Sequence, residues 1–451
     1  LLSQSRQSRH LRSKAMARPA HQWDTSGIKH MKIEEEPQYA NSNVAPIVDA
    51  METERIVESL VKFDITQVGS SAWMEQHRKL EKLNIQAHQN AMTNSDEFVL
   101  EAVLTFNKFE TLLHDLLLIE TWKENVYPLL LEPLTGRNNM RLYFILYHEA
   151  TLINLFEVFM YYRHVCEAGG EKMLELVDYI GRKLARLNNT SYEFRQHDQE
   201  EEEVGATVES AKKFADALQA RSPTEELRKH FMDIEFRICI SAVSIARFLS
   251  EHADAMPLSV VSRITDTHDF LVLIIPLIEN PPWTRRLSTG KWQKLVDHKW
   301  AEVKPIDLLK ITKLEGQPWL AVYYLLAKEV FRERYYLNSF RKGQLLRVRK
   351  YINDLMLDQL PFLADIQRYM DELAVTDVPE PASLGNSAFL FQQVASMQEA
   401  ISKGRKWPEV AQLQVDTVFT LTDKDDKELM RLADLYADDM AGVLSEDVGD
   451  A

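Results

Sequence analysis

Residues 257–286 read PLSVVSRITDTHDFLVLIIPLIENPPWTRR, and this stretch decides the fold class. Five of its apolar residues follow the i, i+3, i+4, i+7, i+8 spacing of one helical face, namely Phe270, Leu273, Ile274, Leu277 and Ile278. A helix with such a face is stable when a second element covers that face. The stretch therefore predicts a pair of packed helices.

The segment before this helix supplies the partner helix. Ser259 is a candidate N-cap, and it is followed by the apolar residues Val260, Val261 and Ile264. A polar turn at 266–269 lets the chain fold back. Pro276 predicts a kink in the second helix, and the pair Pro281 and Pro282 ends it. These signals describe one two-helix unit of a solenoid, followed by a corner.

Apolar helical stripes recur along the chain without a fixed period. Three further sets are Phe109, Leu112, Leu113, Leu116 and Leu117; Leu320, Tyr323, Tyr324 and Ala327; and Leu345, Val348, Ile352 and Leu355. Strand signals are nearly absent, because no hairpin dipeptide lies between alternating segments and the 451 residues include 14 glycines. We therefore expect an all-α protein, an irregular helical solenoid of the armadillo or HEAT type.

Three polar segments divide the sequence. Residues 1–50 predict a disordered leader, 188–222 an acidic linker and 376–388 a short linker. Between them we expect a first helical block at 51–187, an armadillo-like second helical block at 223–375, and C-terminal helices at 389–445. The leader carries basic residues and no acid before Asp24, so a mitochondrial transit peptide is the alternative interpretation of it.

Composition narrows the function class. The net charge of −15 opposes general affinity for nucleic acids and anionic membranes. Cys166 and Cys239 each lie in an amphipathic helical stretch, which favours packing thiols in a reducing compartment over a disulfide framework. The longest apolar run, 271–278, is shorter than the roughly 20 residues that span a bilayer. We expect a cytoplasmic protein without a transmembrane segment.

No catalytic or metal motif is complete in the sequence. His148-Glu149 begins like the zinc-protease motif, but that motif needs a second histidine where Leu152 stands. Phosphate-binding glycine loops, the Gly-x-Ser-x-Gly nucleophile elbow and Cys-x-x-Cys pairs are absent. The sequence therefore predicts a binding protein, not an enzyme, with no cofactor or metal in this chain.

Two features are candidates for binding a partner. Three tryptophans, Trp283, Trp319 and Trp407, stand next to prolines and predict packed corners between helices, with a second role as hot spots. A basic cluster at 341–350 lies beside aromatic residues, which favours a solvated helix face over a phosphate-backbone site. Contact with an acidic protein tail or an acidic segment of this chain stays open. We place the partner-binding surface at Trp283, Arg285, Arg286, Arg341, Lys342 and Arg347.

Six segments carry a family resemblance. They are TQVGSSAWMEQHRKLEKLNIQA at 66–87, YHEATLINLFE at 147–157, PLIENPPWTRR at 276–286, KLEGQPWLAVYYLL at 313–326, NSFRKGQLLRVR at 338–349 and LMLDQLPFLADIQ at 355–367. Together they resemble the zinc finger MYND domain-containing protein 10 family, also called the BLU family, over roughly residues 52–440.

The resemblance implies a cytoplasmic adaptor for the pre-assembly of axonemal inner and outer dynein arms, required for motile cilia. The implied partners are a leucine-rich-repeat dynein assembly factor, an immunophilin co-chaperone and the ninety-kilodalton heat-shock chaperone, with dynein chains as clients. The implied locations are cytoplasmic dynein-assembly particles and centriolar satellites.

One part of the family pattern has no counterpart here. The family ends in a MYND finger, a cysteine-rich module that binds two zinc ions, expected just after residues 423–444. Cys166 and Cys239 are far apart, so no zinc site can be built from them. We expect the finger to be missing, because the chain is either a fragment or a form that lacks it.

Two other function classes stay open. A general helical-solenoid adaptor in trafficking or signalling has the same physical signature. A lysine methyltransferase is the second alternative, since that family also contains MYND fingers, but the strand-rich signatures of its SET domain are not visible.

Overall fold

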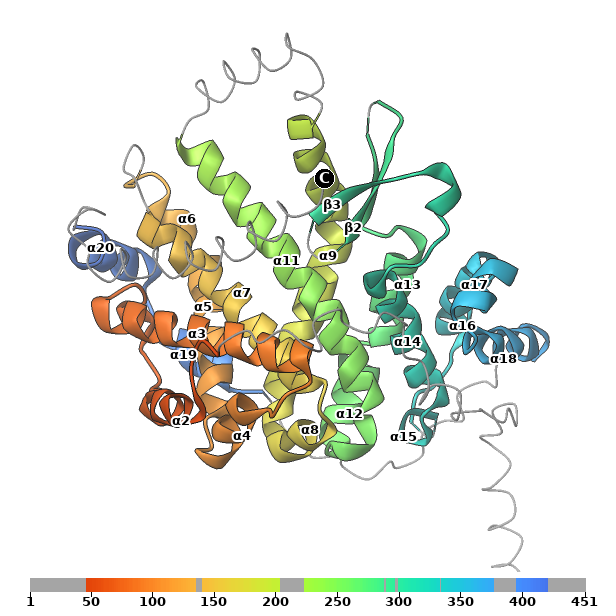
Figure 1. The fold of residues 1–451 in the computed structure, drawn as a ribbon, viewed down its shortest axis with the longest axis horizontal. Coiled ribbons are helices and arrows are strands. Elements are labelled where there is room, and N and C mark those ends of the chain that lie inside the picture. Colours follow the sequence, from red (N-terminus) through yellow and green to blue (C-terminus); the bar gives the residue numbers. More distant parts are fainter. Residues whose placement is uncertain are drawn as a thin grey trace, which may run out of the picture. The chain divides into compact units, whose positions relative to one another are not determined.

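The structure, a computed structural model, describes residues 46–134, 140–202, 223–287, 289–296, 299–332, 334–376 and 395–420. Its chain forms two compact units. Within the described ranges, the N-terminal unit comprises residues 46–179, 196–242 and 395–420, and the central unit comprises 180–195 and 243–376. Helices dominate both units (Figure 1).

The N-terminal unit is a helical bundle. Its helices are α2 (Ala50–Ser59), α3 (Ser71–Thr93), α4 (Phe98–Thr105), α5 (Phe109–Asn125), α6 (Tyr127–Leu130), α7 (Met140–Met160), α8 (Arg163–Gly169), α19 (Met397–Ser402) and α20 (Trp407–Thr417), with parts of α9 (Met173–Glu202) and α11 (Pro223–Glu251). The central helix α7 packs against α3 and α5. All five residues of the predicted stripe at 109–117 are buried in α5, which confirms that helical face.

Helix α7 has the length and hydropathy of a membrane-spanning helix. Among the described residues it is the one helix that is long and apolar enough to cross a bilayer. However, 78% of its apolar window is buried inside the structure, as expected of a core helix. Its polar residues His148 and Glu149 are buried as well, each beside a charged partner.

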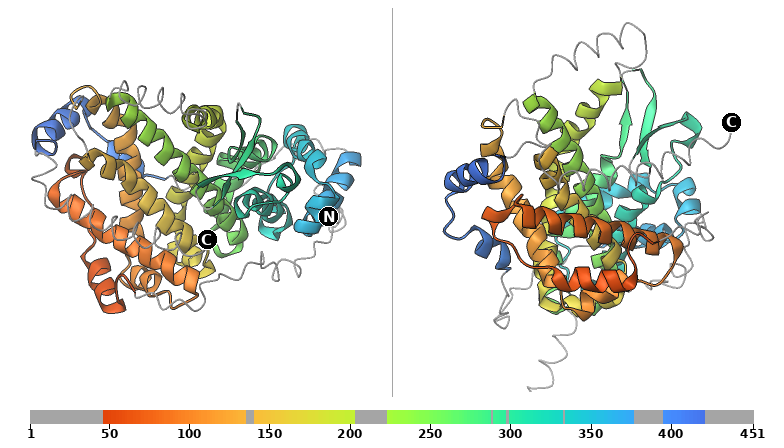
Figure 2. Two further views of the ribbon diagram at one scale, coloured as in Figure 1. Left: turned by 45° about the horizontal axis from the view of Figure 1, so that its top comes forward. Right: turned by 60° about the vertical axis from the view of Figure 1, so that its left-hand side comes forward.

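The central unit combines short helices with a small sheet (Figures 1 and 2). Besides the remaining parts of α9 and α11, its helices are α12 (Leu258–Ser262), α13 (Phe270–Glu279), α14 (Lys313–Ala327), α15 (Glu329–Arg332), α16 (Ser339–Arg347), α17 (Asp354–Gln359) and α18 (Leu363–Val375). Helix α13 packs against α14 and α16, and α18 packs against the same two helices. Of the predicted face of α13, Phe270, Ile274 and Leu277 are buried, whereas Leu273 and Ile278 are half-buried, and Leu271 and Ile275 are buried in addition.

The opening stretch forms two successive helices, but α13 packs mainly on α14 and α16 and not on α12, and the helix ends differ from those predicted. Helix α12 begins at Leu258, so Pro257, not Ser259, takes the N-cap position. A π-helical turn continues it through Arg263–Thr267, into the segment predicted as a turn. Asp269 then caps α13 with its side chain and adopts a left-handed φ of 50°. Helix α13 contains Pro276 and ends at Glu279, just before the two prolines, as predicted.

The all-α prediction is wrong for the segment after α13. Three strands form an antiparallel sheet in the order β1-β2-β3, with β1 at Thr284–Arg286, β2 at Trp292–Val296 and β3 at Lys299–Val303. Lys294 is paired with Thr284 on one side and with Ala301 on the other. Gly290 lies in the turn between β1 and β2 and has a φ of 84°. This left-handed backbone conformation favours glycine, which has no Cβ atom. Trp283 therefore leads into a strand, not into a corner between helices.

Other predictions need smaller corrections. Helix α9 continues to Glu202, so residues 188–202 of the predicted acidic linker are helical, whereas 203–222 lie outside the described residues. Trp319 lies inside α14 and is buried there, so it marks no corner. The stripe predicted from Leu345 to Leu355 is broken into α16, a 3₁₀ turn at Val348–Tyr351 and α17.

The remaining domain predictions fall partly outside the described residues. These include residues 1–45 of the leader, 377–388 of the second linker, and residues 389–394 and 421–445 of the C-terminal helices. The two compact units do not coincide with the predicted blocks 51–187 and 223–375. The armadillo or HEAT type of the solenoid stays a prediction, whereas the mainly helical character is observed.

Candidate functional site

All six predicted partner-binding residues lie in the central unit, but in two separate elements. Trp283, Arg285 and Arg286 lie at and within β1, and Arg341, Lys342 and Arg347 lie in α16. Their partner-binding role stays a prediction. The contacts of each side chain show which of them remain accessible.

Trp283 and Arg285 are buried parts of the sheet. Trp283 is 2% exposed, and its carbonyl accepts a hydrogen bond from the backbone of Leu295 at 2.9 Å. Arg285 is 3% exposed; its Nε donates to Oε1 of Gln293 at 2.7 Å, and its guanidinium lies 4.0 Å from the ring centroid of Trp300. Because these contacts face the interior, both residues act first in packing. Arg286 is exposed and lies over the ring of Trp292.

Arg341 joins α16 to the N-terminus of α13. Its Nε donates to Oδ2 of Asp269 at 2.7 Å, and its terminal nitrogens donate to the carbonyls of Tyr336 and Thr265. Tyr335 donates to the other oxygen of Asp269 at 2.6 Å. Asp269 is also the left-handed capping residue of α13, so Arg341 stabilises a strained position. This internal contact with an acid is one of the alternatives that the sequence left open.

The two remaining basic residues of α16 also have partners within the unit. Lys342 Nζ donates to the carbonyl of Thr376 at 2.7 Å, at the end of α18. Arg347 pairs with Glu279 at the end of α13 and donates to Gln344. The Arg347 side chain is still half exposed. Of the six predicted residues, Arg286 and Arg347 are therefore the ones most accessible to a partner.

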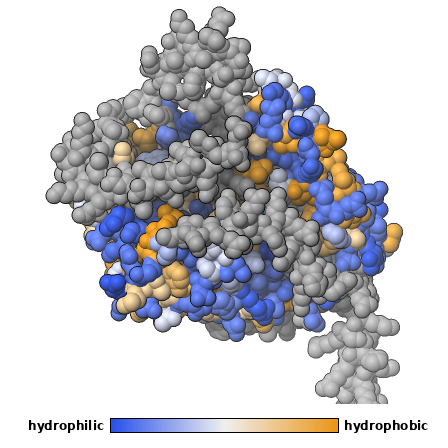
Figure 3. All heavy atoms as spheres, in the orientation of Figure 1, coloured by the Kyte–Doolittle hydropathy of each residue, from blue (hydrophilic) through white to orange (hydrophobic). Residues whose placement is uncertain are grey.

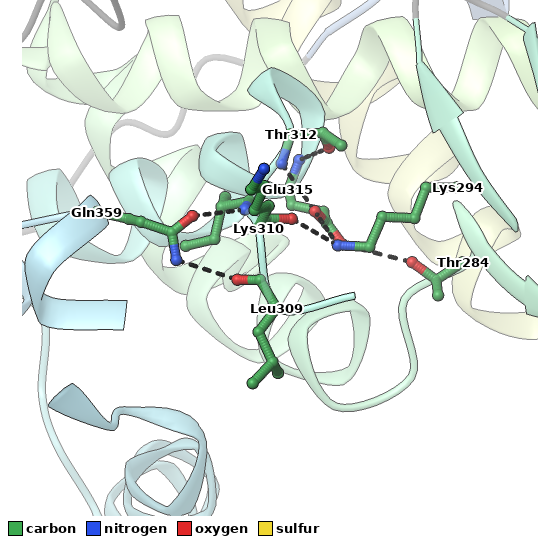
Figure 4. Close-up of polar contacts among 8 residues, drawn as sticks. Thr284, Lys294, Leu309, Lys310, Thr312, Glu315 and Gln359 are labelled. Atoms are coloured by element: carbon green, nitrogen blue, oxygen red, sulfur yellow. Dashed lines mark hydrogen bonds and ion pairs between the residues drawn. The ribbon is translucent and has the colours of Figure 1, made fainter. Parts of the chain in front are cut away.

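A buried polar network holds the sheet against α14 and α17 (Figure 4). Lys294 of β2 donates to Glu315 at 2.9 Å and to the carbonyl of Lys310 at 2.7 Å. Glu315 completes a capping box with Thr312 at the start of α14 and accepts from Thr284 of β1. Gln359 at the end of α17 accepts from the backbone of Ile311 at 2.8 Å. Side chains of β2, α14 and α17 thereby hold the segment 310–312, which leads from the sheet into α14.

An exposed apolar patch lies next to this network, and the sequence analysis missed it. Ile306 is 85% exposed, Leu309 58% and Leu355 45%. Ile306 and Leu309 follow β3, in and after the short 3₁₀ helix η7 (Pro305–Asp307), and Leu355 lies in α17. One sequence signal was available, because Ile306 and Leu309 stand between lysines 304 and 310.

The surroundings of this patch are basic, in contrast to the whole chain. Residues 284–313 contain eight lysines and arginines against three acids, whereas the chain carries a net charge of −15. Lys304, Lys310 and Lys313 are exposed. A hydrogen bond from Lys310 lowers the pKa of Asp307, the acid of η7. The central unit therefore presents a local cationic and apolar surface.

A curated relative from Drosophila melanogaster, named zinc finger MYND domain-containing protein 10 homolog, is 28% identical to this chain over 408 residues. The match covers 87% of this chain and 84% of the relative. This chain is therefore similar to that relative over most of both lengths. No family model and no solved structure matches it. The name of the relative describes a zinc-finger domain and no enzymatic activity.

The residues of this chain do not fit the zinc finger that gives the family its name. The sequence has two cysteines, and both side chains are fully buried, in α8 and α11 of the N-terminal unit. Within the described ranges, no group of three or more His, Cys, Asp or Glu side chains is placed to hold a metal ion. A cysteine-rich zinc module needs four ligands around each ion. We therefore derive no function from zinc.

Proposed function

We propose that this chain is a cytoplasmic adaptor in the pre-assembly of axonemal inner and outer dynein arms and is needed for motile cilia. It acts by binding proteins, without catalysis or a cofactor. The similarity to the zinc finger MYND domain-containing protein 10 homolog, over most of both chains, is the observation that supports this proposal.

The proposed partners are a leucine-rich-repeat dynein assembly factor, an immunophilin co-chaperone and the ninety-kilodalton heat-shock chaperone, with dynein chains as clients. The proposed locations are cytoplasmic dynein-assembly particles and centriolar satellites. In this proposal the helical body makes contacts with partners. Its exposed cationic and apolar surface is a feature that an adaptor of this kind requires.

Affinity purification of the tagged chain from ciliated cells tests the proposal. We expect dynein chains and the chaperones to be enriched over a tagged unrelated helical protein. Depletion of the endogenous protein should leave cilia that form but beat poorly, and expression of this chain should restore the beat. Recovery of neither dynein chains nor chaperones, with normal motility after depletion, would point to an adaptor in another pathway.

A further inference from the structure

Two exposed apolar side chains, Ile306 and Leu309, follow strand β3. In η7 the backbone of Lys304 accepts from Asp307, and the carbonyl of Asp307 accepts in turn from Lys310. Ile306 lies inside η7 and Leu309 lies two residues after its end, and both are more than half exposed.

Gln359 brings the backbone of a third exposed apolar residue, Leu355, near that of Leu309. Its Nε2 lies 3.0 Å from the carbonyl oxygen of Leu309 (Figure 4). It also lies 3.0 Å from the carbonyl oxygen of Leu355, one turn earlier in α17. Two carbonyls that share one donor belong to neighbouring backbones. We define the η7 patch as Ile306, Leu309 and Leu355 with the lysines 304, 310 and 313. Figure 3 shows hydrophobic residues among hydrophilic ones over this part of the central unit.

The η7 patch rests on a rigid base. Lys294 is buried at 5% exposure and binds the carbonyl of Lys310, while Gln359 binds the backbone of Leu309 and Ile311. A surface fixed in this way loses little conformational entropy when a ligand binds. Large apolar side chains that stay in water on such a base are typical of a binding site.

Charge selects the class of partner. Lysines 304, 310 and 313 surround the apolar residues, and residues 284–313 are net positive in a strongly negative chain. Asp354 and Asp358 are exposed on α17 near Leu355, and Asp307 of η7 pairs with Lys310, so Lys304 and Lys313 supply most of the uncompensated positive charge. A long polyanion such as nucleic acid would meet repulsion from the rest of the chain. A short acidic protein segment fits this distribution better.

We propose that the η7 patch is the docking site for an acidic helical segment of a partner protein, with leucine-type side chains spaced i, i+3 or i+4, i+7. The leucines cover Ile306, Leu309 and Leu355, and the acids of the segment meet the three lysines. This docking site would serve the proposed adaptor function, and it rests on that function only in assuming that the chain acts by binding proteins. Three apolar side chains make a small interface, so a micromolar complex is expected.

Fluorescence anisotropy with the full chain tests this site. The probe is a labelled synthetic helix of about 20 residues, built from Glu and Ala with Leu at helical spacing. We expect saturable binding that weakens with salt. The double variant Ile306→Ser/Leu309→Ser should bind about tenfold more weakly or worse, and so should Lys304→Glu/Lys310→Glu. Matched controls on the N-terminal unit are Leu413→Ser and Lys406→Glu, which alter similarly exposed residues and should leave binding unchanged.

Several outcomes would overturn the proposal. These are no saturable binding, equal binding of a probe with Ser in place of Leu, an equal loss in the controls, or better binding of a single-stranded oligonucleotide. Light scattering that shows a dimer broken by Ile306→Ser would assign the patch to a second copy of the chain. Unchanged thermal unfolding of the variants separates lost docking from lost folding. The probe experiment contains no dynein component, so its failure leaves the dynein-assembly proposal to the affinity purification.

Discussion

His77 lies fully buried in α3, beside a second buried histidine. Its Nδ1 is 2.8 Å from Nδ1 of His148, whose Nε2 lies 3.2 Å from Asp115 of α5. Trp73 stacks on His77 and packs against His148. Burial, followed by the charge of His148, lowers the pKa of His77 well below its ordinary value. The residue pair His148-Glu149, which begins like a metal motif in the sequence, is thus a pair of core residues in α7.

We predict that acid destabilises the chain partly through His77. The folded pKa lies below the unfolded value of about 6.5, so the unfolded chain takes up a proton first as the pH falls. Stability is therefore present above that value and is lost as the pH falls from about 7 to 5. In thermal unfolding across this range, His77→Gln should flatten the dependence of stability on pH.

His114, whose pKa is also lowered by burial, should leave a residual slope in this variant. His164→Gln, at an exposed position, is the comparison variant. An identical slope in the wild-type chain and in His77→Gln would show that His77 does not contribute.

A second residue-scale prediction concerns Lys123, which is buried in the same unit. Its Nζ lies 2.7 Å from Glu149 and also contacts Glu235, and Tyr179 donates to Glu149 at 2.7 Å. Lys123→Met would leave two carboxylates buried without their cation, which costs about 3–5 kcal/mol. Urea unfolding should show this loss.

The triple change Lys123→Met, Glu149→Gln and Glu235→Gln should recover part of that stability, since it removes the buried charges together. Lys406→Met, at an exposed ion pair, is the comparison and should stay within about 0.5 kcal/mol of wild type. A loss of similar size in both single variants would contradict this account of the buried network.

At the scale of elements, helices were predictable and the sheet was not. The stripe in α5 could be read directly, because a helix that buries one face repeats its apolar residues every three to four positions. The strands are three to five residues long, and polar residues are buried on both faces of the sheet: Arg285 and Gln293 on one, Lys294 on the other. Alternation of polar and apolar residues therefore does not mark them. The η7 patch was missed because the exposure of Ile306 depends on the path of the chain in three dimensions.

Trp283 directly precedes β1 and is almost fully buried, so its replacement tests how the sheet is held in place. Trp283→Ala should cost about 3–5 kcal/mol through the lost burial and the cavity that remains. Chemical unfolding measures this cost. Trp292→Ala, in the partly exposed position of the neighbouring strand, should cost less. A near-neutral Trp283→Ala variant that has lost partner binding would instead make Trp283 an exposed hot spot.

At the scale of the whole chain, net charge and sequence similarity give two different kinds of information. A net charge of −15 keeps most of the surface repulsive toward polyanions, while residues 284–313 are net positive. Neither feature names a partner, and the family name comes from matched residues over 87% of the chain. The segments quoted in the sequence analysis suggested that resemblance through their residue strings and not through physical patterns. The η7 patch could be found only from the exposed fractions of its side chains, which a sequence does not give.

The last prediction joins the docking surface to the proposed function. Cells depleted of the endogenous protein are supplied with wild-type chain, the Ile306→Ser/Leu309→Ser variant or Leu413→Ser. Because Ile306 and Leu309 are exposed, the double variant should fold and accumulate normally, yet it should fail to restore ciliary beat and should recover less chaperone and dynein in affinity purification. Leu413→Ser should restore both. Full rescue by the double variant would show that dynein-arm assembly uses another surface, even if the patch binds an acidic helix in solution.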